Sequence, residues 1–411
     1  MEFTRKDLLK QLYITRRNII KLILGGAAGI HLTPLPWKLM DDIAIWTQNW
    51  PWIPVPPVGE FNHAKSVCTL CPGGCGIEVR KVDERAVKIE GRTDYPVNPG
   101  GICPLGAGGL QLLYNENIRF TGPLKRIGPR GSGKYAPISW EEALKTLSHR
   151  IRSLREKGHP ERLAAINGYP LRSSMGLFVD RLIEAVGSPN SIRMPTSEDT
   201  AALVNRLMQG NAGPVAYDLE NADFILSFGC GLIEGWGAPG RMINAWGLWH
   251  GKPDQKRVKI VQIESRASNT ASKADGWLAP GPGTEAALAL GFAHVIIREG
   301  LYDTGFIPNH TFGFMDWTGS DGKGHKGFKT LILEKYSPET VSKITGVEAN
   351  LIVNVAKDFA RAKAPIALFG KGKGELNGNL LECMAVHSLN ALVGNINMPG
   401  GVLVHEPLPL K

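Results

Sequence analysis

The pattern of apolar and polar positions changes along the chain, and from residue 139 onward it alternates between two periods. Short apolar runs predict buried strands, at residues 163–166, 224–228, 258–263 and 366–369. Apolar residues at helical spacing predict helices, at residues 139–157, 177–186, 241–250, 284–299, 349–362 and 379–393. Strands that alternate with helices are typical of parallel sheets covered on both faces. We therefore predict an α/β fold for this part of the chain.

The residues before this α/β part follow a different pattern. Residues 77–82 and 86–90 predict two short strands joined by a turn. Residues 37–62 form a strap rich in tryptophan and proline, and its prolines disfavour helix and favour extended chain. Its tryptophans are too numerous to remain in water. The strap therefore either packs on its own domain or docks on a partner subunit or a membrane surface.

Residues 1–36 begin the chain with a basic segment followed by a mildly apolar one. Arg16 and Arg17 precede the glycine-rich apolar run at 22–30. This order resembles a twin-arginine export signal, a route taken by proteins already folded around their cofactors, and the alternative is an ordinary amphipathic helix. The apolar run is shorter than the roughly 20 residues that span a bilayer. We expect a signal or anchor, and a location on the periplasmic side of the cytoplasmic membrane.

The composition limits the class of protein. Hydrophobic residues make up 43% of the 411 residues, which is typical of a globular chain. A chain of this length accommodates two or three domains. The net charge is +9, and part of it lies in the basic leader. Because no basic run is interleaved with aromatic residues, we expect no nucleic-acid partner.

Four of the six cysteines lie in one window, at Cys68, Cys71, Cys75 and Cys103. The first three are close enough in sequence for one loop to present them to a single centre, and the fourth returns after the predicted strand pair. Four thiolates around one centre suit a cubane iron–sulfur cluster. The surrounding glycines and prolines let backbone amides approach the cluster sulfurs. We predict one 4Fe–4S cluster held by these four residues.

Two other uses of the cysteines fit this window less well. A zinc site typically has Cys-x2-Cys pairs at both ends, whereas Cys103 stands alone at the far end of this window. A disulfide framework is typical of short secreted chains, and a chain of 411 residues does not need such cross-links. Both alternatives are therefore disfavoured.

The spacing Cys-x2-Cys-x3-Cys-x27-Cys, with Leu112-Leu113-Tyr114-Asn115 after it, resembles the amino-terminal segment of the molybdopterin oxidoreductases. This family includes formate dehydrogenases, periplasmic nitrate reductases and polysulfide and thiosulfate reductases. The resemblance implies a small 4Fe–4S domain at 63–125 and two Rossmann-like domains with parallel sheets. One of these would be discontinuous, at 126–205 and 330–411, and the other would be inserted at 206–329.

Several loops resemble the sites that hold the guanosine diphosphate and pterin parts of the family's cofactor, molybdenum bis-molybdopterin guanine dinucleotide. An acid at the end of a strand can accept hydrogen bonds from ribose, and the amino terminus of a helix can hold a phosphate. The candidate cofactor-binding residues are Gly229, Cys230, Gly231, Glu264, Arg266, Gly283, Thr284, Glu285, Gly370 and Gly372. Each loop alone is common in α/β proteins, and only their order carries the resemblance.

Three departures from the family pattern bear on function. The family usually has a lysine or arginine two residues after the fourth cysteine, where this chain has Leu105. A lysine there would be buried, so Leu105→Lys is expected to destabilise a protein that holds no pterin. No cysteine stands where catalytic members often hold the metal, and Ser197, Glu198 and Asp199 are weak oxygen-ligand candidates that equally suit a helix cap or first turn.

The third departure concerns the family's carboxy-terminal barrel domain. The chain ends at Lys411 and is expected to lack this domain. It would then be a fragment, the product of a split gene, or a subunit that no longer needs the cofactor.

Three functions follow as hypotheses. The leader and strap resemble the molybdopterin-like subunits of membrane-associated quinone reductase complexes and of alternative complex III. This favours an electron-transfer subunit whose partners are a ferredoxin-like iron–sulfur subunit and a membrane subunit, with a cytochrome c subunit as a further candidate. The second hypothesis is a catalytic molybdenum oxidoreductase acting on a small oxyanion or sulfur compound. The third is a non-enzymatic scaffold that holds zinc.

Overall fold

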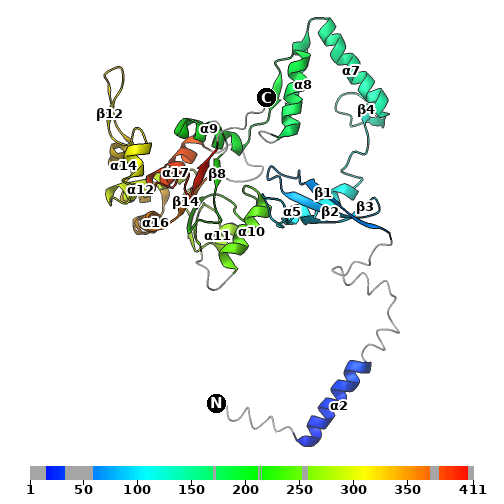
Figure 1. The fold of residues 1–411 in the computed structure, drawn as a ribbon, viewed down its shortest axis with the longest axis horizontal. Coiled ribbons are helices and arrows are strands. Elements are labelled where there is room, and N and C mark those ends of the chain that lie inside the picture. Colours follow the sequence, from blue (N-terminus) through cyan, green and yellow to red (C-terminus); the bar gives the residue numbers. More distant parts are fainter. Residues whose placement is uncertain are drawn as a thin grey trace. The chain divides into compact units, whose positions relative to one another are not determined.

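The computed structural model describes residues 15–32, 59–169, 173–211, 213, 215–251, 258–370 and 379–405 (Figure 1). Most of the predicted strap and the candidate Gly372 lie outside the described residues. The chain divides into two compact units, of which the first contains Met1–Asn62 and Val82–Arg85 and the second contains His63–Lys81 and Ala86–Lys411. We describe each unit by itself.

Helix α2 (Arg16–Leu32) is the main element of the first unit. It begins at the paired arginines, directly after Thr15, whose carbonyl accepts a hydrogen bond from the Asn18 amide. The helix contains the apolar run predicted from the sequence. Across the described residues, none of the helices combines the length and the hydropathy needed to cross a membrane.

The cysteine window lies on a small antiparallel-hairpin scaffold. Strands β1 (Phe61–Val67), β2 (Gly76–Val82) and β3 (Arg85–Gly91) form a three-stranded sheet in that order. Two short helices follow, α5 (Pro104–Ala107) and α6 (Gly109–Tyr114). The predicted pair of strands at 77–82 and 86–90 is confirmed, and β2 and β3 are joined at Asp83, which has a positive φ of 51°.

Residues 124–193 begin the α/β part. Its elements are β4 (Leu124–Arg126), β5 (Tyr135–Pro137), α7 (Trp140–Glu156), the short 3-10 helix η1 (Pro160–Arg162), β6 (Ala165–Asn167), α8 (Ser174–Val186) and β7 (Ser191–Arg193). Helix α7 begins as its capping pattern predicts, since the Glu142 amide donates to Ser139 Oγ at 3.1 Å. Strands β6 and β7 pair in parallel, and α8 packs on both.

A four-stranded parallel sheet organises residues 197–405. Its strands lie in the order β11 (Gly276–Leu278), β10 (Lys259–Ile263), β9 (Phe224–Phe228) and β14 (Pro365–Leu368). Its helices are α9 (Ser197–Gln209), α10 (Pro239–His250), α11 (Asn269–Lys273), α12 (Glu285–Arg298), α13 (Phe306–His310), α14 (Phe328–Lys335), α15 (Pro338–Thr345), α16 (Ala349–Arg361) and α17 (Leu380–Leu392). Two antiparallel pairs complete it, β8 (Val215–Tyr217) with β15 (Val402–Val404) and β12 (Trp317–Thr318) with β13 (Gly324–His325).

The position of β14 differs from the predicted division into domains. The sequence grouped 330–411 with 126–205, but β14 pairs with β9 along its whole length, in the same sheet as β10. Residues 330–405, where described, therefore belong to the α/β layer of 206–329. The alternation of strands and helices could not show this, because it does not say which strands become neighbours.

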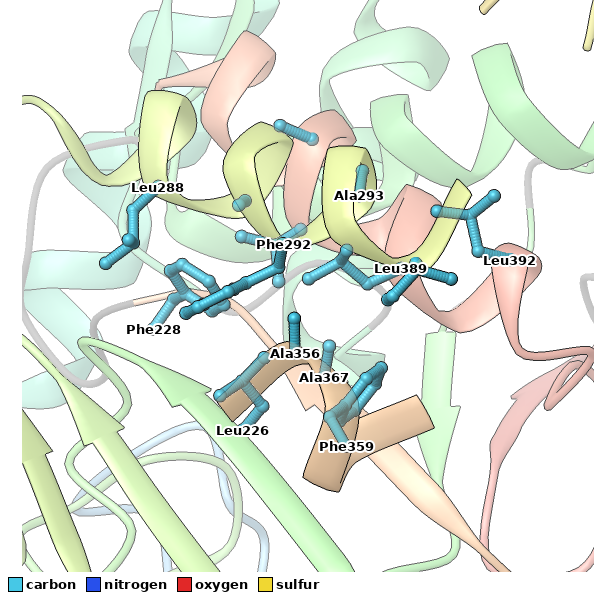
Figure 2. Close-up of a cluster of buried hydrophobic side chains, with 14 of the residues drawn as sticks. Leu226, Phe228, Leu288, Phe292, Ala293, Ala356, Phe359, Ala367, Leu389 and Leu392 are labelled. Atoms are coloured by element: carbon cyan, nitrogen blue, oxygen red, sulfur yellow. The ribbon is translucent and has the colours of Figure 1, made fainter. Parts of the chain in front are cut away.

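The core of this region lies on both faces of the sheet. Alternate side chains of β9 point to opposite faces, and all five are buried. Leu226 and Phe228 join one cluster with helices α12, α16 and α17 (Figure 2). Ile225 joins the other cluster, which includes Trp249 of α10. This double coverage is what a parallel sheet requires.

Candidate iron–sulfur centre and adjoining cavity

The four cysteines of the window line one small cavity. Cys68, Cys71, Cys75 and Cys103 contribute to its wall together with Leu105, and none of the four forms a disulfide. Cys68 directly follows β1, Cys75 directly precedes β2, and Cys103 caps α5. The hairpin thus brings the fourth cysteine back to the first three, as the sequence predicts.

Backbone amides point at the sulfurs of this cavity. The Gly73 amide donates to Cys71 Sγ at 3.3 Å, and the Gly106 amide donates to Cys103 Sγ at 3.4 Å. Burial raises the pKa of the Cys75 thiol, a backbone hydrogen bond at Gly240 opposes this, and the neighbouring cysteines raise it further. Positive charge beside the Cys75 sulfur, as iron supplies it, would favour its thiolate form.

The first turn of α10 packs against the cysteine loops without room for side chains. A Cβ atom at Gly101 would lie 2.3 Å from the Gly240 carbonyl oxygen. A Cβ atom at Gly240 would lie 3.1 Å from Cys75 Sγ. Gly101 therefore leaves no space for a side chain and Gly240 leaves little, so the cysteine loops and the start of α10 are in close backbone contact.

Asn98 connects the loops around the cavity, and it was not predicted from the sequence. Its side chain is fully buried, its Oδ1 accepts from the Gly76 amide at 2.8 Å, and its Nδ2 donates to the carbonyls of Gly76 and Gly101. From α10, Asn244 Nδ2 donates to the Asn98 carbonyl at 3.1 Å. One asparagine among prolines and glycines offers no sequence signal, because its importance comes from partners distant in the chain.

The donor set suits a cluster. Four cysteines line one cavity, and in a cubane each of four thiolates binds a different iron.

A second cavity of about 560 Å³ adjoins the cysteine loop. Pro72, between the second and third cysteines, lines it together with residues of α9, β8, α10 and the end of β14. Of the predicted site residues that the structure describes, Ser197, Glu198 and Gly370 lie in its wall. The cavity is large enough for part of a pterin cofactor.

Two side chains that the sequence analysis missed shape this second cavity. Arg241 Nε donates to Glu220 Oε1 at 2.7 Å, and its Nη2 donates to the Tyr217 carbonyl at 2.9 Å. Trp236 packs on Tyr217 with ring centroids 5.5 Å apart and donates from Nε1 to the Phe369 carbonyl at 3.3 Å. Trp236 follows the carboxyl end of β9, a place where ligands commonly bind, and that was the available signal.

Two of the three oxygen-ligand candidates, Asp199 and Ser197, differ in the contacts that their side chains make. Asp199 completes a capping box at the start of α9: its Oδ2 accepts from the Thr196 amide at 2.7 Å and from Arg193 Nη1 at 3.0 Å. Partial burial opposes ionisation of Asp199, but the hydrogen bonds from Arg193 and Thr196 lower its pKa. The Asp199 carboxylate therefore already accepts hydrogen bonds from Thr196 and Arg193, whereas Ser197 lines the cavity.

The predicted nucleotide loops meet at the carboxyl edge of the parallel sheet. The Gly229 amide donates to the Ile263 carbonyl at 2.8 Å, which brings Gly229, Cys230 and Gly231 beside Glu264. Gly229 has a φ of +67°, as a tight turn after a strand requires. Glu264 accepts from Ser268 Oγ through its carboxylate and from Trp277 Nε1 at 2.9 Å through its carbonyl.

The other members of this set lie around the start of α12 or are buried. Gly283 and Thr284 directly precede the helix, and Glu285 is its first residue and is buried. Thr284 Oγ1 donates to the Gly281 carbonyl at 2.6 Å. Cys230 is fully buried, and burial raises the pKa of its thiol well above the ordinary value. Arg266 is exposed.

Leu105 is 51% exposed at the rim of the cysteine cavity. The expectation that a lysine at this position would be buried is wrong for the described residues. The cause is local: α5 has only four residues, and Gly106 is its one buried residue. A short helix at the edge of a small domain leaves its other side chains near solvent.

Fold and site together define an iron–sulfur protein in which a cysteine-rich hairpin domain is joined to a parallel α/β region. Comparison with known families agrees. Residues 62–115 match the molybdopterin oxidoreductase Fe4S4 domain, and residues 119–405 match the molybdopterin oxidoreductase family. The chain therefore belongs to the molybdopterin oxidoreductase family. These matches support a 4Fe–4S cluster and a molybdenum bis-molybdopterin guanine dinucleotide as its cofactors.

Individual relatives place the chain more closely. It is 34% identical to the menaquinone reductase molybdopterin-binding-like subunit of Nitratidesulfovibrio vulgaris over 95% of this chain and 52% of that protein. It is 29% identical to the thiosulfate reductase subunit PhsA of Salmonella typhimurium over 84% of this chain and 42% of that protein. The chain thus spans about half the length of these curated relatives.

A solved structure shows the same fold. Acetylene hydratase from Pelobacter acetylenicus aligns with a TM-score of 0.65 at 24% identity, over 84% of this chain and 45% of that one. At this level of identity the likeness concerns the fold alone.

Proposed function

We propose that this chain is the iron–sulfur electron-transfer subunit of a quinone-linked respiratory complex on the periplasmic side of the cytoplasmic membrane. The observation that carries the proposal is the cysteine cavity, whose rim holds the exposed apolar side chains Leu70 and Leu105. An apolar rim beside a cluster suits close contact with a redox partner, because it brings the two centres together without burying charge. The 34% identity to a subunit of menaquinone reductase supports the same role.

The partners follow from that role. The cluster in this chain would exchange electrons with a ferredoxin-like iron–sulfur subunit, while a membrane subunit handles the quinone and a cytochrome c subunit is a further candidate. The leader supports export by the twin-arginine route, since α2 begins at Arg16 and Arg17. Changing both arginines to lysine should retain the protein in the cytoplasm. Cell fractionation measures this, and an unchanged periplasmic yield would contradict the route.

A second function is favoured by the 560 Å³ cavity beside the cysteine loop. The chain would then catalyse reduction of a small oxyanion or sulfur compound, as the thiosulfate reductase and arsenate respiratory reductase relatives are named for doing. Ser197 and Glu198 offer oxygen ligands in its wall. The bound cofactor would supply oxygen-atom or two-electron transfer, and these residues would orient it.

Metal analysis of anaerobically purified, full-length protein tests the two functions. Electron transfer requires about four iron atoms per chain, and catalysis requires molybdenum in addition. Cys103→Ser should lower the iron content and the visible absorbance, whereas the matched variant Cys230→Ser, at a buried cysteine outside the cavity, should keep both. A zinc-only protein, or iron lost in Cys230→Ser but kept in Cys103→Ser, would overturn the proposal.

Ser197→Ala then separates the alternatives. If Ser197 holds molybdenum, the variant should lose molybdenum and keep iron. Equal molybdenum content in the variant and the wild type would remove Ser197 as a ligand.

A further inference from the structure

Helix α10 begins without the side-chain acceptor that commonly caps a helix. Its N-cap residue, Ala238, forms no side-chain hydrogen bond, and its first turn contains no acidic residue. The first amides of a helix have no partner within the helix, so they need an acceptor from elsewhere. Pro239 at the first position has no amide hydrogen, which makes Gly240 the first residue of the helix that can donate.

The acceptor at this helix start is one of the four cysteines of the cluster cavity. A backbone hydrogen bond from Gly240 lowers the pKa of the Cys75 thiol and so opposes the effect of burial. A thiolate sulfur has no hydrogen to donate, so the donor is the Gly240 amide. Cys75 is buried, whereas the other three cysteines are partly exposed. Water therefore weakens the hydrogen bond at Cys75 less than it would at the other sulfurs.

Asn244 connects this helix start to the cysteine loops. It lies one helical turn after Gly240, so both residues face the same side of α10. Its Nδ2 donates to the Asn98 carbonyl at 3.1 Å and to the Pro99 carbonyl at 2.8 Å. The Asn98 side chain in turn accepts a hydrogen bond from the backbone amide that directly follows Cys75. The hydrogen bonds of Asn244 thus join α10 to the loop that also positions Cys75.

We propose that Asn244 is a positioning residue that raises the reduction potential of the cluster, because it keeps the Gly240 amide on the Cys75 sulfur. Reduction adds one electron to the cluster, so a donor at a ligand sulfur stabilises the reduced form more than the oxidised form. The amino terminus of α10 adds positive partial charge at the same sulfur. The inference rests on the cluster and not on the electron-transfer role proposed above, since the potential is measured without any partner.

Two variants of Asn244 test this role in full-length protein that is purified anaerobically with its iron. Asn244→Ala removes both hydrogen bonds. It should lower the ratio of reduced to oxidised cluster at a fixed potential by about tenfold, a shift of about 59 mV for one electron. Asn244→Ser keeps one donor and should shift the ratio in the same direction by less. Potentiometric titration followed by electron paramagnetic resonance measures the ratio, and iron analysis checks for about four iron atoms per chain.

Asn379→Ala is the matched control, because Asn379 caps α17 by accepting a hydrogen bond from the Leu381 amide at 3.0 Å. It should lower stability without shifting the ratio. A change in Asn244→Ala that is no larger than in the control, or that favours the reduced cluster, would overturn the proposal. Loss of iron in both Asn244 variants would also overturn it, because Asn244 would then maintain the fold instead of tuning the cluster. If the alanine variant alone loses iron, the serine variant decides by the same comparison with the control.

Discussion

The two α/β regions of this protein are built from the same kinds of element but differ in how completely their apolar side chains are buried. We call residues 197–405 the closed region and residues 124–193 the open region. In residues 197–405, every side chain of the central strand β9 is buried between two layers of helices. In residues 124–193, Asn167 is the only buried residue of strand β6, and the outward apolar side chains of the helices are exposed. The helices of both regions have amphipathic sequences. The two regions therefore differ in how many layers of helices and strands cover the sheet, and not in the pattern of apolar and polar residues.

This difference shows which segments complete and cover a parallel sheet. β14 lies far from β9 in sequence, yet it pairs with β9, and its helices α16 and α17 cover the sheet. The pair β6 and β7 receives no such late strand from the described residues. Closure of a parallel sheet depends on distant segments, and the four predictions below test the comparison from the largest expected effect to the smallest.

The largest effect is expected in the closed region, at Phe292 of α12. Its ring is fully buried and meets Phe228 edge to face, with centroids 6.3 Å apart (Figure 2). Phe292→Ala should lower the free energy of unfolding by about 3–5 kcal/mol. The matched change in the open region, Phe178→Ala, should alter it by less than about 0.5 kcal/mol in the isolated chain. Urea unfolding followed by circular dichroism measures both.

Equal losses in the two variants would contradict the comparison. A large loss in Phe178→Ala alone would mean that the chain covers Phe178 by itself in solution.

The second effect is a pH dependence of the free energy of unfolding that arises from a residue in the closed region. His387 of α17 is fully buried and hydrogen-bonds Gln209 at 3.0 Å, and burial lowers its pKa to about 4. As the pH falls from 6.5 towards 4, His387 binds a proton in the unfolded chain but not in the folded chain, so the free energy of unfolding falls. The loss should reach about 3 kcal/mol over this window and be absent above it.

His387→Gln removes the titrating group and serves as the test. The slope of the free energy of unfolding against pH should flatten between pH 6.5 and 4 in this variant. A slope identical to that of the wild type would show that other groups cause the acid sensitivity.

The third effect is smaller and lies where the closed region begins. Asp199→Ala removes the capping box of α9 and the partner of Arg193, and should cost about 1 kcal/mol. Ser197→Ala, two residues earlier, leaves the capping box formed by Thr196 and Asp199 in place and should cost less. Thermal melting of both variants measures the difference. Equal losses would mean that Ser197 also has a structural role.

How much of this could be predicted from the sequence depended on the range of the interactions. The four cysteines and four helices of residues 197–405, α10, α12, α16 and α17, were predicted, because their spacing is local and periodic. The partnership of β14 with β9 and the role of Asn98 were not, since both depend on contacts between distant segments.

The candidate site divides in the same way. Gly229 and Glu264 were predicted from the ends of their strands, and they do lie side by side. Arg241 and Trp236 were missed, because a cavity wall assembled from four elements leaves no pattern in any one of them. The exposure of Leu105 was also mispredicted: position relative to a cysteine motif does not determine burial.

The smallest effect concerns Leu105, which is exposed and apolar like Phe178 but lies at the rim of the cysteine cavity. Because its side chain already reaches solvent, Leu105→Lys should change the free energy of unfolding by less than about 0.5 kcal/mol. The added positive charge should nevertheless raise the reduction potential of the bound cluster, since net charge tunes it. Leu112→Lys, an equally apolar exposed position on α6 outside the cavity wall, is the matched control and should shift the potential less. Potentiometric titration and thermal melting measure the two quantities. A Leu105→Lys protein that loses several kcal/mol would show that a partner or a further segment covers the rim, and the exposed rim would then no longer distinguish this domain from the closed region.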